Sequence, residues 1–312
     1  MCAMRKILLF TILLCLSLAL SAQKASNVVA KQVGNTVEIT YDLDKTAIVT
    51  LLLSDNGGET YSIVPQSVTG DVGIISGGNA KKIIWNMLGD AEDWEIERAR
   101  FNVDTQGAGE LTFTVGDIQF TMVQIEAGYF HSAKMDEFHI GKVEVTQAFW
   151  ETVTGTNPSS FVNPDNPVEN VSWNDCQVFI RTLNKAFAPQ LGNKIFALPT
   201  EKQWQYAAEG ASHATPLPKR FSGSDIPGAV AWFKDNSEAK THKVAAKMAN
   251  EIGLFDMTGN VAEWCGPEGE ISAIRGGSWA DDENGCLTAN RMSLSPDTKQ
   301  NTCGFRLVLV DK

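Results

Sequence analysis

The pattern of apolar and polar positions in the first third of the chain is that of short β-strands. Residues 36–41 alternate apolar and polar side chains, which is the period-two signature of a strand with one buried face. Residues 47–53 form a more apolar run that ends at the Asp-Asn-Gly-Gly turn sequence of residues 55–58. Residues 82–85 and 99–103 complete the set. Several strands at this spacing, without a convincing helical pattern, predict a small β-sandwich.

The pattern changes after residues 104–109, which contain two glycines and are predicted to be a linker. Thr146 is placed to cap a helix, and residues 172–175 resemble a capping box ahead of apolar positions at helical spacing. Residues 200–203 repeat this pattern directly after a proline. The sequence therefore predicts an α+β second domain with much irregular structure, and places the domains at residues 23–107 and 108–312.

Residues 1–22 have the features of a secretory signal peptide. Arg5 and Lys6 precede an apolar run, residues 7–20, which is too short to cross a bilayer as a helix, and small residues follow it. Cys15 lies within the apolar run without a small neighbour, so we favour a cleaved signal over a lipid anchor, which stays the alternative. We expect export to the periplasm, the cell surface or the extracellular space, with no transmembrane segment.

The charge balance argues against nucleic acid as a partner. The chain has 26 Lys and Arg against 37 Asp and Glu, a net charge of −11, and no basic cluster longer than a pair. Export makes disulfides possible. Four cysteines remain after the predicted cleavage, and their three possible pairings are left open by the sequence: Cys176, Cys265, Cys286 and Cys303.

Six short strings in the second domain resemble the formylglycine-generating enzyme family, also called sulfatase-modifying factors. The resemblance covers about residues 118–310. It implies a fold similar to that of C-type lectins, and the first domain resembles the small immunoglobulin-like modules that precede such domains in exported bacterial proteins. The strings are Lys142–Thr146, Asn170–Asp175, Leu198–Glu201, Gly253–Trp264, Arg275–Trp279 and Gly304–Arg306.

The resemblance also identifies where catalysis would occur. Catalytic members oxidise a cysteine of a sulfatase with oxygen and copper(I), which is held by two thiols that follow a Gly-Gly-Ser string. The matching positions here are Asp281 and Cys286. A carboxylate is a hard donor that holds copper(I) poorly, so copper is not expected. No catalytic residue is assigned, and the candidates are Cys286, Asp281 and Ser278, the last of which also suits a simple turn.

Calcium is the metal that the resemblance supports. Family members bind it through side chains at the positions of Asp256, Glu263 and Glu144 and through backbone carbonyls at those of Gly259 and Val261. Carboxylate and carbonyl oxygens are the ligands that calcium prefers. The alternative is that these carboxylates cap turns or pair with arginine, and the same sequence predicts that Arg275 and Arg306 tie loops together through carboxylates.

The favoured interpretation is an exported, non-catalytic member of this family that acts as a binding or envelope-assembly module for a protein or glycan ligand. Two alternatives remain: an oxidoreductase of formylglycine-generating type that acts on a protein cysteine, and a structural envelope component without a specific ligand. The sequence does not identify the ligand or the oligomeric state.

Overall fold

The computed structural model describes residues 25–90, 99–106, 109–211, 219–266 and 272–312. The chain divides into two compact units, Met1–Leu111 with Ala188–Asn193 and Thr112–Phe187 with Lys194–Lys312. The predicted signal peptide lies outside the described residues. Residues 104–106, which the sequence assigned to a linker, instead continue a strand, because their backbone pairs with residues 48–50.

The first unit contains two sheets that share one apolar core. A four-stranded sheet has the order β1-β2-β6-β4 and a three-stranded sheet the order β5-β3-β7. The inward residues of both sheets, among them Ile39, Leu51 and Trp85, form a single hydrophobic cluster. The elements are β1 (Ala25–Val33), β2 (Thr36–Leu43), β3 (Ala47–Ser54), β4 (Val68–Gly70), β5 (Gly73–Ile75), β6 (Gly78–Asn86), α1 (Met87–Asp90) and β7 (Arg100–Gln106).

Where one face of a strand is buried and the other is not, the alternation of buried residues in this unit follows the sequence pattern. In β2 every second residue is buried, as the period-two pattern of residues 36–41 predicted. Strand β1 was not predicted, because its partly exposed residues give no clean alternation. Residues 23–24, 91–98 and 107 of the predicted first domain lie outside the described residues, and the immunoglobulin-like assignment stays a prediction.

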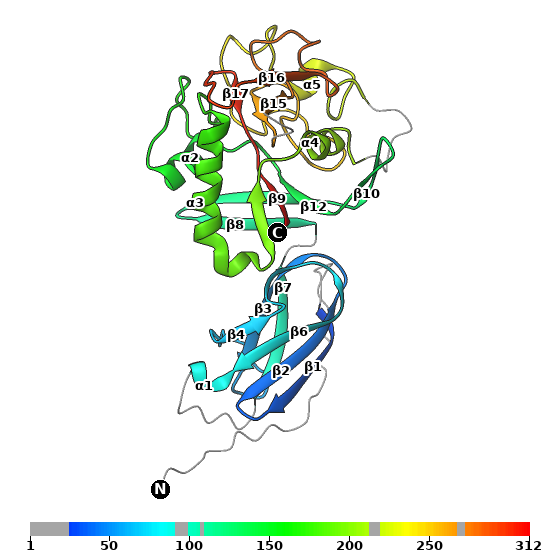
Figure 1. Ribbon diagram of the computed structural model, residues 1–312, viewed down its shortest axis with the longest axis vertical. Coiled ribbons are helices and arrows are strands. Elements are labelled where there is room, and N and C mark those ends of the chain that lie inside the picture. Colours follow the sequence, from blue (N-terminus) through cyan, green and yellow to red (C-terminus); the bar gives the residue numbers. More distant parts are fainter. Residues whose placement is uncertain (1–24, 91–98, 107–108, 212–218, 267–271) are drawn as a thin grey trace. The chain divides into compact units, whose positions relative to one another are not determined.

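Within its described residues, the second unit combines two sheets, a hairpin and four helices, which are labelled in Figure 1. A five-stranded sheet has the order β13-β18-β12-β9-β8, and a four-stranded sheet the order β16-β15-β14-β17. The elements are β8 (Glu110–Val115), β9 (Ile118–Ile125), β10 (Gly128–Phe130), β11 (Ala133–Met135), β12 (Phe138–Gly141), α2 (Gln147–Thr154), α3 (Trp173–Leu191), β13 (Lys194–Ala197), α4 (Glu201–Ala208), α5 (Pro227–Val230), β14 (Ala262–Trp264), β15 (Ser272–Arg275), β16 (Arg291–Leu294), β17 (Cys303–Gly304) and β18 (Val308–Asp311).

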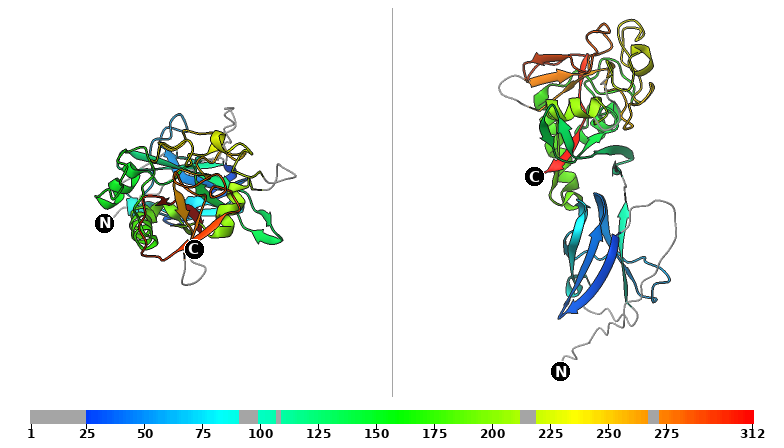
Figure 2. Two further views of the ribbon diagram at one scale, coloured as in Figure 1. Left: turned by 90° about the horizontal axis from the view of Figure 1, so that it is seen from above. Right: turned by 90° about the vertical axis from the view of Figure 1, so that its right-hand side faces the viewer.

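The helix starts predicted from the sequence are confirmed. Thr146 accepts the backbone N–H of Phe149 at 3.2 Å and caps α2. Ser172 and Asp175 bond reciprocally at the start of α3, and Thr200 forms a capping box with Gln203 at the start of α4. Helix α2 packs on β9 and α4 on β15. The long loops of residues 219–261, yellow to orange, gather around the four-stranded sheet (right-hand view of Figure 2).

Strand β12 carries a buried histidine whose ring has no hydrogen-bond partner among the described residues. His139 is fully buried, and both ring nitrogens are unsatisfied. Burial, assisted by the charge of Lys194, lowers the pKa of His139 to about 3. The unfolded chain therefore binds a proton at this ring between about pH 6.5 and 3, where the folded protein does not.

We expect His139 to make the protein less stable as the pH falls from 6.5 towards 3. Replacing it with phenylalanine should flatten this slope and, by removing two unpaired polar atoms, stabilise the fold by about 1–3 kcal/mol at neutral pH. Urea unfolding of both proteins at several pH values measures the difference. An unchanged slope in His139→Phe would mean that other groups carry the acid sensitivity.

Candidate functional site

The loop from Gly276 to Cys286 holds the three candidate catalytic residues. Gly276 and Gly277 have positive φ values of 92° and 68°. A Cβ atom at Gly277 would lie 2.6 Å from the carbonyl oxygen of Gly285 and 2.8 Å from the sulfur of Cys286. The loop therefore returns on itself so closely that position 277 requires glycine, for both backbone conformation and space.

Ser278 and Asp281 form a closed turn within this loop. The backbone N–H and the hydroxyl of Ser278 both donate to one carboxylate oxygen of Asp281, at 2.9 and 2.6 Å. The thiol of Cys286 lies 3.8 Å from the carbonyl oxygen of Ser278. The structure thus brings the three predicted candidates together, and the contacts that Asp281 makes are those of a turn-forming residue.

The thiol of Cys286 is held in its protonated form. Burial, and then the negative charge of Asp281, raise the pKa of Cys286 to about 12. Cys303 has its pKa raised to about 12, mainly by burial and in smaller part by the same carboxylate. Because the thiolate is the form that attacks carbon or sulfur and binds soft metals, neither thiol is activated here.

No disulfide forms among the described cysteines. Cys176, Cys265, Cys286 and Cys303 are all buried as free thiols, so none of the three pairings left open by the sequence is present. Burial raises the pKa of Cys176 and Cys265 well above the usual range for a thiol. The four residues behave as small apolar core side chains.

An aromatic pair flanks the turn, and we call Phe161, Val162, Trp279 and Asp281 the Trp279 surface. The rings of Phe161 and Trp279 meet edge to face with centroids 5.3 Å apart, and the indole N–H of Trp279 donates to the carbonyl of Asn301 at 2.9 Å. Val162, next in the chain, is 76% exposed. The four residues therefore combine one exposed apolar side chain, two half-buried aromatic rings and a carboxylate.

The predicted calcium ligands meet a buried guanidinium. Arg306 is fully buried and donates to both carboxylate oxygens of Glu263, from Nε at 2.7 Å and from Nη2 at 2.6 Å. The indole of Trp204 adds a third bond to Glu263, at 2.7 Å. Glu263 is therefore the bidentate partner of an arginine, which is the alternative that the sequence left open.

The other two acidic residues are bonded within the protein as well. Glu144 accepts hydrogen bonds from the amide of Asn260 at 3.0 Å and from the backbone N–H of Val261 at 3.3 Å. One oxygen of Asp256 accepts the N–H of Ala245 at 2.6 Å, and the other is buried without a partner in the described structure.

Burial and mutual repulsion disfavour full ionisation of this acidic group. The pKa of Glu144 is raised well above its usual range, first by burial and then by the charges of Asp256 and Glu263. Burial raises the pKa of Asp256 to about 6. Glu263 and Arg306 form the central ion pair, and the raised pKa of Glu144 favours its neutral form beside that pair.

The side chains of the predicted calcium ligands are bonded within the protein. No group of three or more His, Cys, Asp or Glu side chains in the described ranges has the arrangement of a metal site. The backbone N–H groups of Gly259 and Val261 bond to the carbonyl of Gly276 and the carboxylate of Glu144. Calcium at Glu144, Asp256, Gly259, Val261 and Glu263 stays a prediction from the resemblance.

Chelation tests it. If these residues bind calcium, elemental analysis of the purified protein should find stoichiometric calcium, and EDTA should lower the melting temperature, because an ion at 100 times its Kd contributes about 2.7 kcal/mol. That fall, together with calcium in the analysis, would support the ligand set and require the arginine to share Glu263 with the ion. An unchanged melting temperature with no calcium found would remove the site.

Two further groups were only partly foreseen from the sequence. The prediction that arginines tie loops to carboxylates is confirmed for Arg306. Arg275 lies 3.6 Å from Glu201 but donates its hydrogen bonds to the carbonyls of Ala289 and Asn290 and to the side chain of Gln205. The stack of His242 on Trp232, at 3.9 Å between ring centroids, was missed. Neither residue lies in a motif that would indicate the contact.

The comparisons with known proteins identify the family. The family described as "Sulfatase-modifying factor enzyme 1-like domain" matches residues 95–310. Chaperone protein LppX of Paenibacillus barcinonensis is 29% identical over 225 residues, which cover 52% of this chain and 80% of that protein. Inactive C-alpha-formylglycine-generating enzyme 2 of Bos taurus is 28% identical over 180 residues, or 52% of this chain and 56% of the relative.

A catalytic relative is similar to a comparable degree. The formylglycine-generating enzyme of Streptomyces coelicolor is 26% identical over 200 residues, or 53% of this chain and 59% of the enzyme. The chain therefore spans little more than half the length of both formylglycine-generating relatives. Among solved structures, Treponema denticola variable protein 1 superposes with a TM-score of 0.56 at 28% identity, covering 65% of this chain and 99% of that one. CarF gives a TM-score of 0.51 at 25% identity, covering 60% and 97%.

Proposed function

Because the chain belongs to the sulfatase-modifying factor family, we propose that it is a non-catalytic member that binds a protein or glycan ligand. The observation that carries the proposal is the state of the Gly276–Cys286 loop. Catalytic members, as the resemblance implies, place two thiols on copper(I). In this chain the first of these two thiol positions is Asp281, which accepts two hydrogen bonds from Ser278. The second is Cys286, whose thiol is buried and has a pKa of about 12. One carboxylate and one thiol are a poor ligand set for copper(I), which prefers two soft thiolates.

The names of two relatives support a function without catalysis. One is called an inactive formylglycine-generating enzyme and the other a chaperone protein. We propose that the Trp279 surface is the binding surface, because its exposed Val162 and its aromatic pair offer apolar area beside the charge of Asp281.

We also propose export, through the signal peptide at residues 1–22, to the periplasm, the cell surface or the extracellular space. The described residues contain no helix that is both long enough and apolar enough to cross a membrane. In this proposal the first unit, with its two sheets, serves as an immunoglobulin-like spacer or docking module for envelope assembly.

An oxidation assay tests the absence of catalysis. The full chain, supplied with copper(I), oxygen and a peptide containing Cys-x-Pro-x-Arg, should consume no oxygen above the buffer rate and form no formylglycine by mass spectrometry. Conversion of the peptide would establish the alternative, an oxidoreductase that acts on a protein cysteine. One observation favours that alternative: the charge of Asp281 acts on both Cys286 and Cys303, so two thiols lie near one carboxylate.

A paired substitution tests the binding surface. Val162→Asp places a charge on the Trp279 surface, and Val178→Asp places the same charge on α3, where Val178 is 52% exposed. Once a ligand is identified by crosslinking in the producing cells, Val162→Asp should weaken its binding and Val178→Asp should leave it intact. Equal binding by both variants would exclude this surface.

A further inference from the structure

A half-open hollow of about 170 Å³ lies in the second unit, apart from the Gly276–Cys286 loop. It forms where β12 ends. Strands β9 and β12 pair as far as Met122 and Gly141, and the N–H of Lys142 makes one more bond to the carbonyl of Thr121 at 2.9 Å. The chain then leaves β9, because Val145 bonds to the carbonyl of Phe305 instead. This divergence opens the space.

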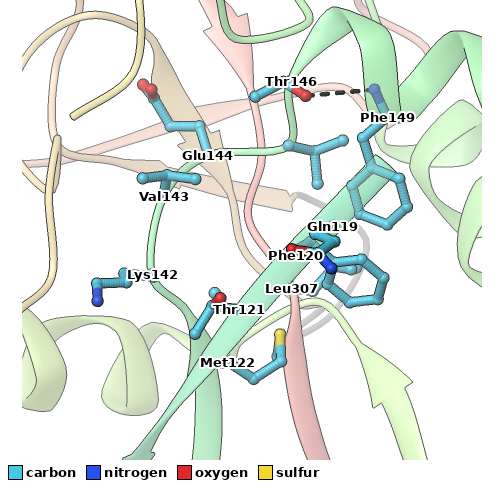
Figure 3. Close-up of a pocket in the computed structure, with 12 residues that line it drawn as sticks. Gln119, Phe120, Thr121, Met122, Lys142, Val143, Glu144, Thr146, Phe149 and Leu307 are labelled. Atoms are coloured by element: carbon cyan, nitrogen blue, oxygen red, sulfur yellow. Dashed lines mark hydrogen bonds between the residues drawn. The ribbon is translucent and has the colours of Figure 1, made fainter. Parts of the chain in front are cut away.

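Most of the exposed wall of the hollow is apolar, and the polar side chains in it are Gln119, Thr121, Lys142, Glu144 and Thr146. The rings of Phe120 and Phe149 stack with centroids 4.4 Å apart, and Met122 and Leu307 are buried beside them. Figure 3 shows the charged ends of Lys142 and Glu144 pointing away from the two rings. The ring of Phe120 also lies within 6.0 Å, centroid to centroid, of three further phenylalanines, so the wall belongs to a preformed aromatic block: Phe113, Phe187 and Phe196.

We propose that this hollow binds a single uncharged, ring-sized group of the phenyl type. An engineered apolar cavity of about 150 Å³ takes up benzene, so a volume of this size holds one six-membered ring. Two phenylalanine rings and a methionine sulfur favour an aromatic occupant over an aliphatic one. The ring can belong to a free aromatic molecule or to a phenylalanine side chain of a polypeptide. The proposal does not rest on the function proposed above.

Toluene is the probe for the ring itself. In the full chain with 13C-methyl methionine, toluene should shift the Met122 resonance saturably and leave that of Met248, which is 63% exposed, in place. Val143→Phe, which fills the hollow, should weaken toluene binding by about tenfold or more. Val162→Phe, the same change in an exposed loop, should leave the affinity unaltered.

Three outcomes would overturn the proposal: no saturable shift of Met122, an equal shift of Met248, or unaltered toluene affinity in Val143→Phe. If Val143→Phe does not fold, the selectivity of the wild-type protein for Met122 over Met248 still decides. N-acetyl-phenylalaninamide separates the sources. If N-acetyl-phenylalaninamide competes with toluene, the occupant is a phenylalanine side chain of a polypeptide. If toluene binds but N-acetyl-phenylalaninamide does not, the occupant is a free aromatic molecule.

Discussion

Replacing Arg306 with methionine should lower the free energy of unfolding by about 3–5 kcal/mol, because it leaves a buried carboxylate without its partner. Arg306 is fully buried and bonds to both oxygens of Glu263 and to the carbonyls of Gly141 and Phe255. The substitution also removes the hydrogen bonds by which Arg306 links its own segment to Gly141 and to the segment that contains Phe255 and Glu263. Urea unfolding followed by tryptophan fluorescence measures the change.

Two further variants separate this effect from general damage. Adding Glu263→Gln to Arg306→Met should recover part of the loss, since the neutral amide carries no unpaired charge and still accepts from Trp204. Arg291→Met removes a half-exposed partner of Glu201 and should cost about 0–1 kcal/mol. Equal losses for Arg306→Met and Arg291→Met would contradict a central role for the buried pair.

Replacing Asp281 with cysteine should raise the affinity for copper(I) by several orders of magnitude. The substitution restores two thiols at the spacing of the catalytic relatives, and a soft ion prefers thiolates to carboxylates. It also removes the negative charge that helps to raise the pKa of Cys286. Competition with a copper(I) chelator of known affinity measures the change, and Asp282→Cys, at an exposed neighbouring position, is the matched control.

Activity need not accompany the copper in Asp281→Cys, because the turn closed by Ser278 and Asp281 is also lost. Tight copper binding by the wild-type protein would contradict our description of the loop. It would mean that Cys303 or another donor completes a site with Cys286, and it would favour the oxidoreductase alternative.

Local interactions account for what the sequence by itself determined. The helix starts at Thr146, Ser172 and Thr200 depend on hydrogen bonds between residues three apart, so composition and spacing are enough to find them. The alternation in β2 depends only on which face is buried. The motif strings identified the family for the same reason. Each is a continuous segment, so it can be recognised without knowing which residues it contacts in the fold.

Long-range packing decided the rest. Whether Glu263 faces a metal ion or an arginine depends on Arg306, 43 residues away, which no local pattern places beside it. The burial of His139 and the hollow beside Phe120 arise from the order of strands in one sheet and from the point where β12 leaves β9. The sequence supplies the charged and aromatic side chains, but the fold decides which of them become neighbours. Burial in the fold then shifts the pKa values of the titratable groups.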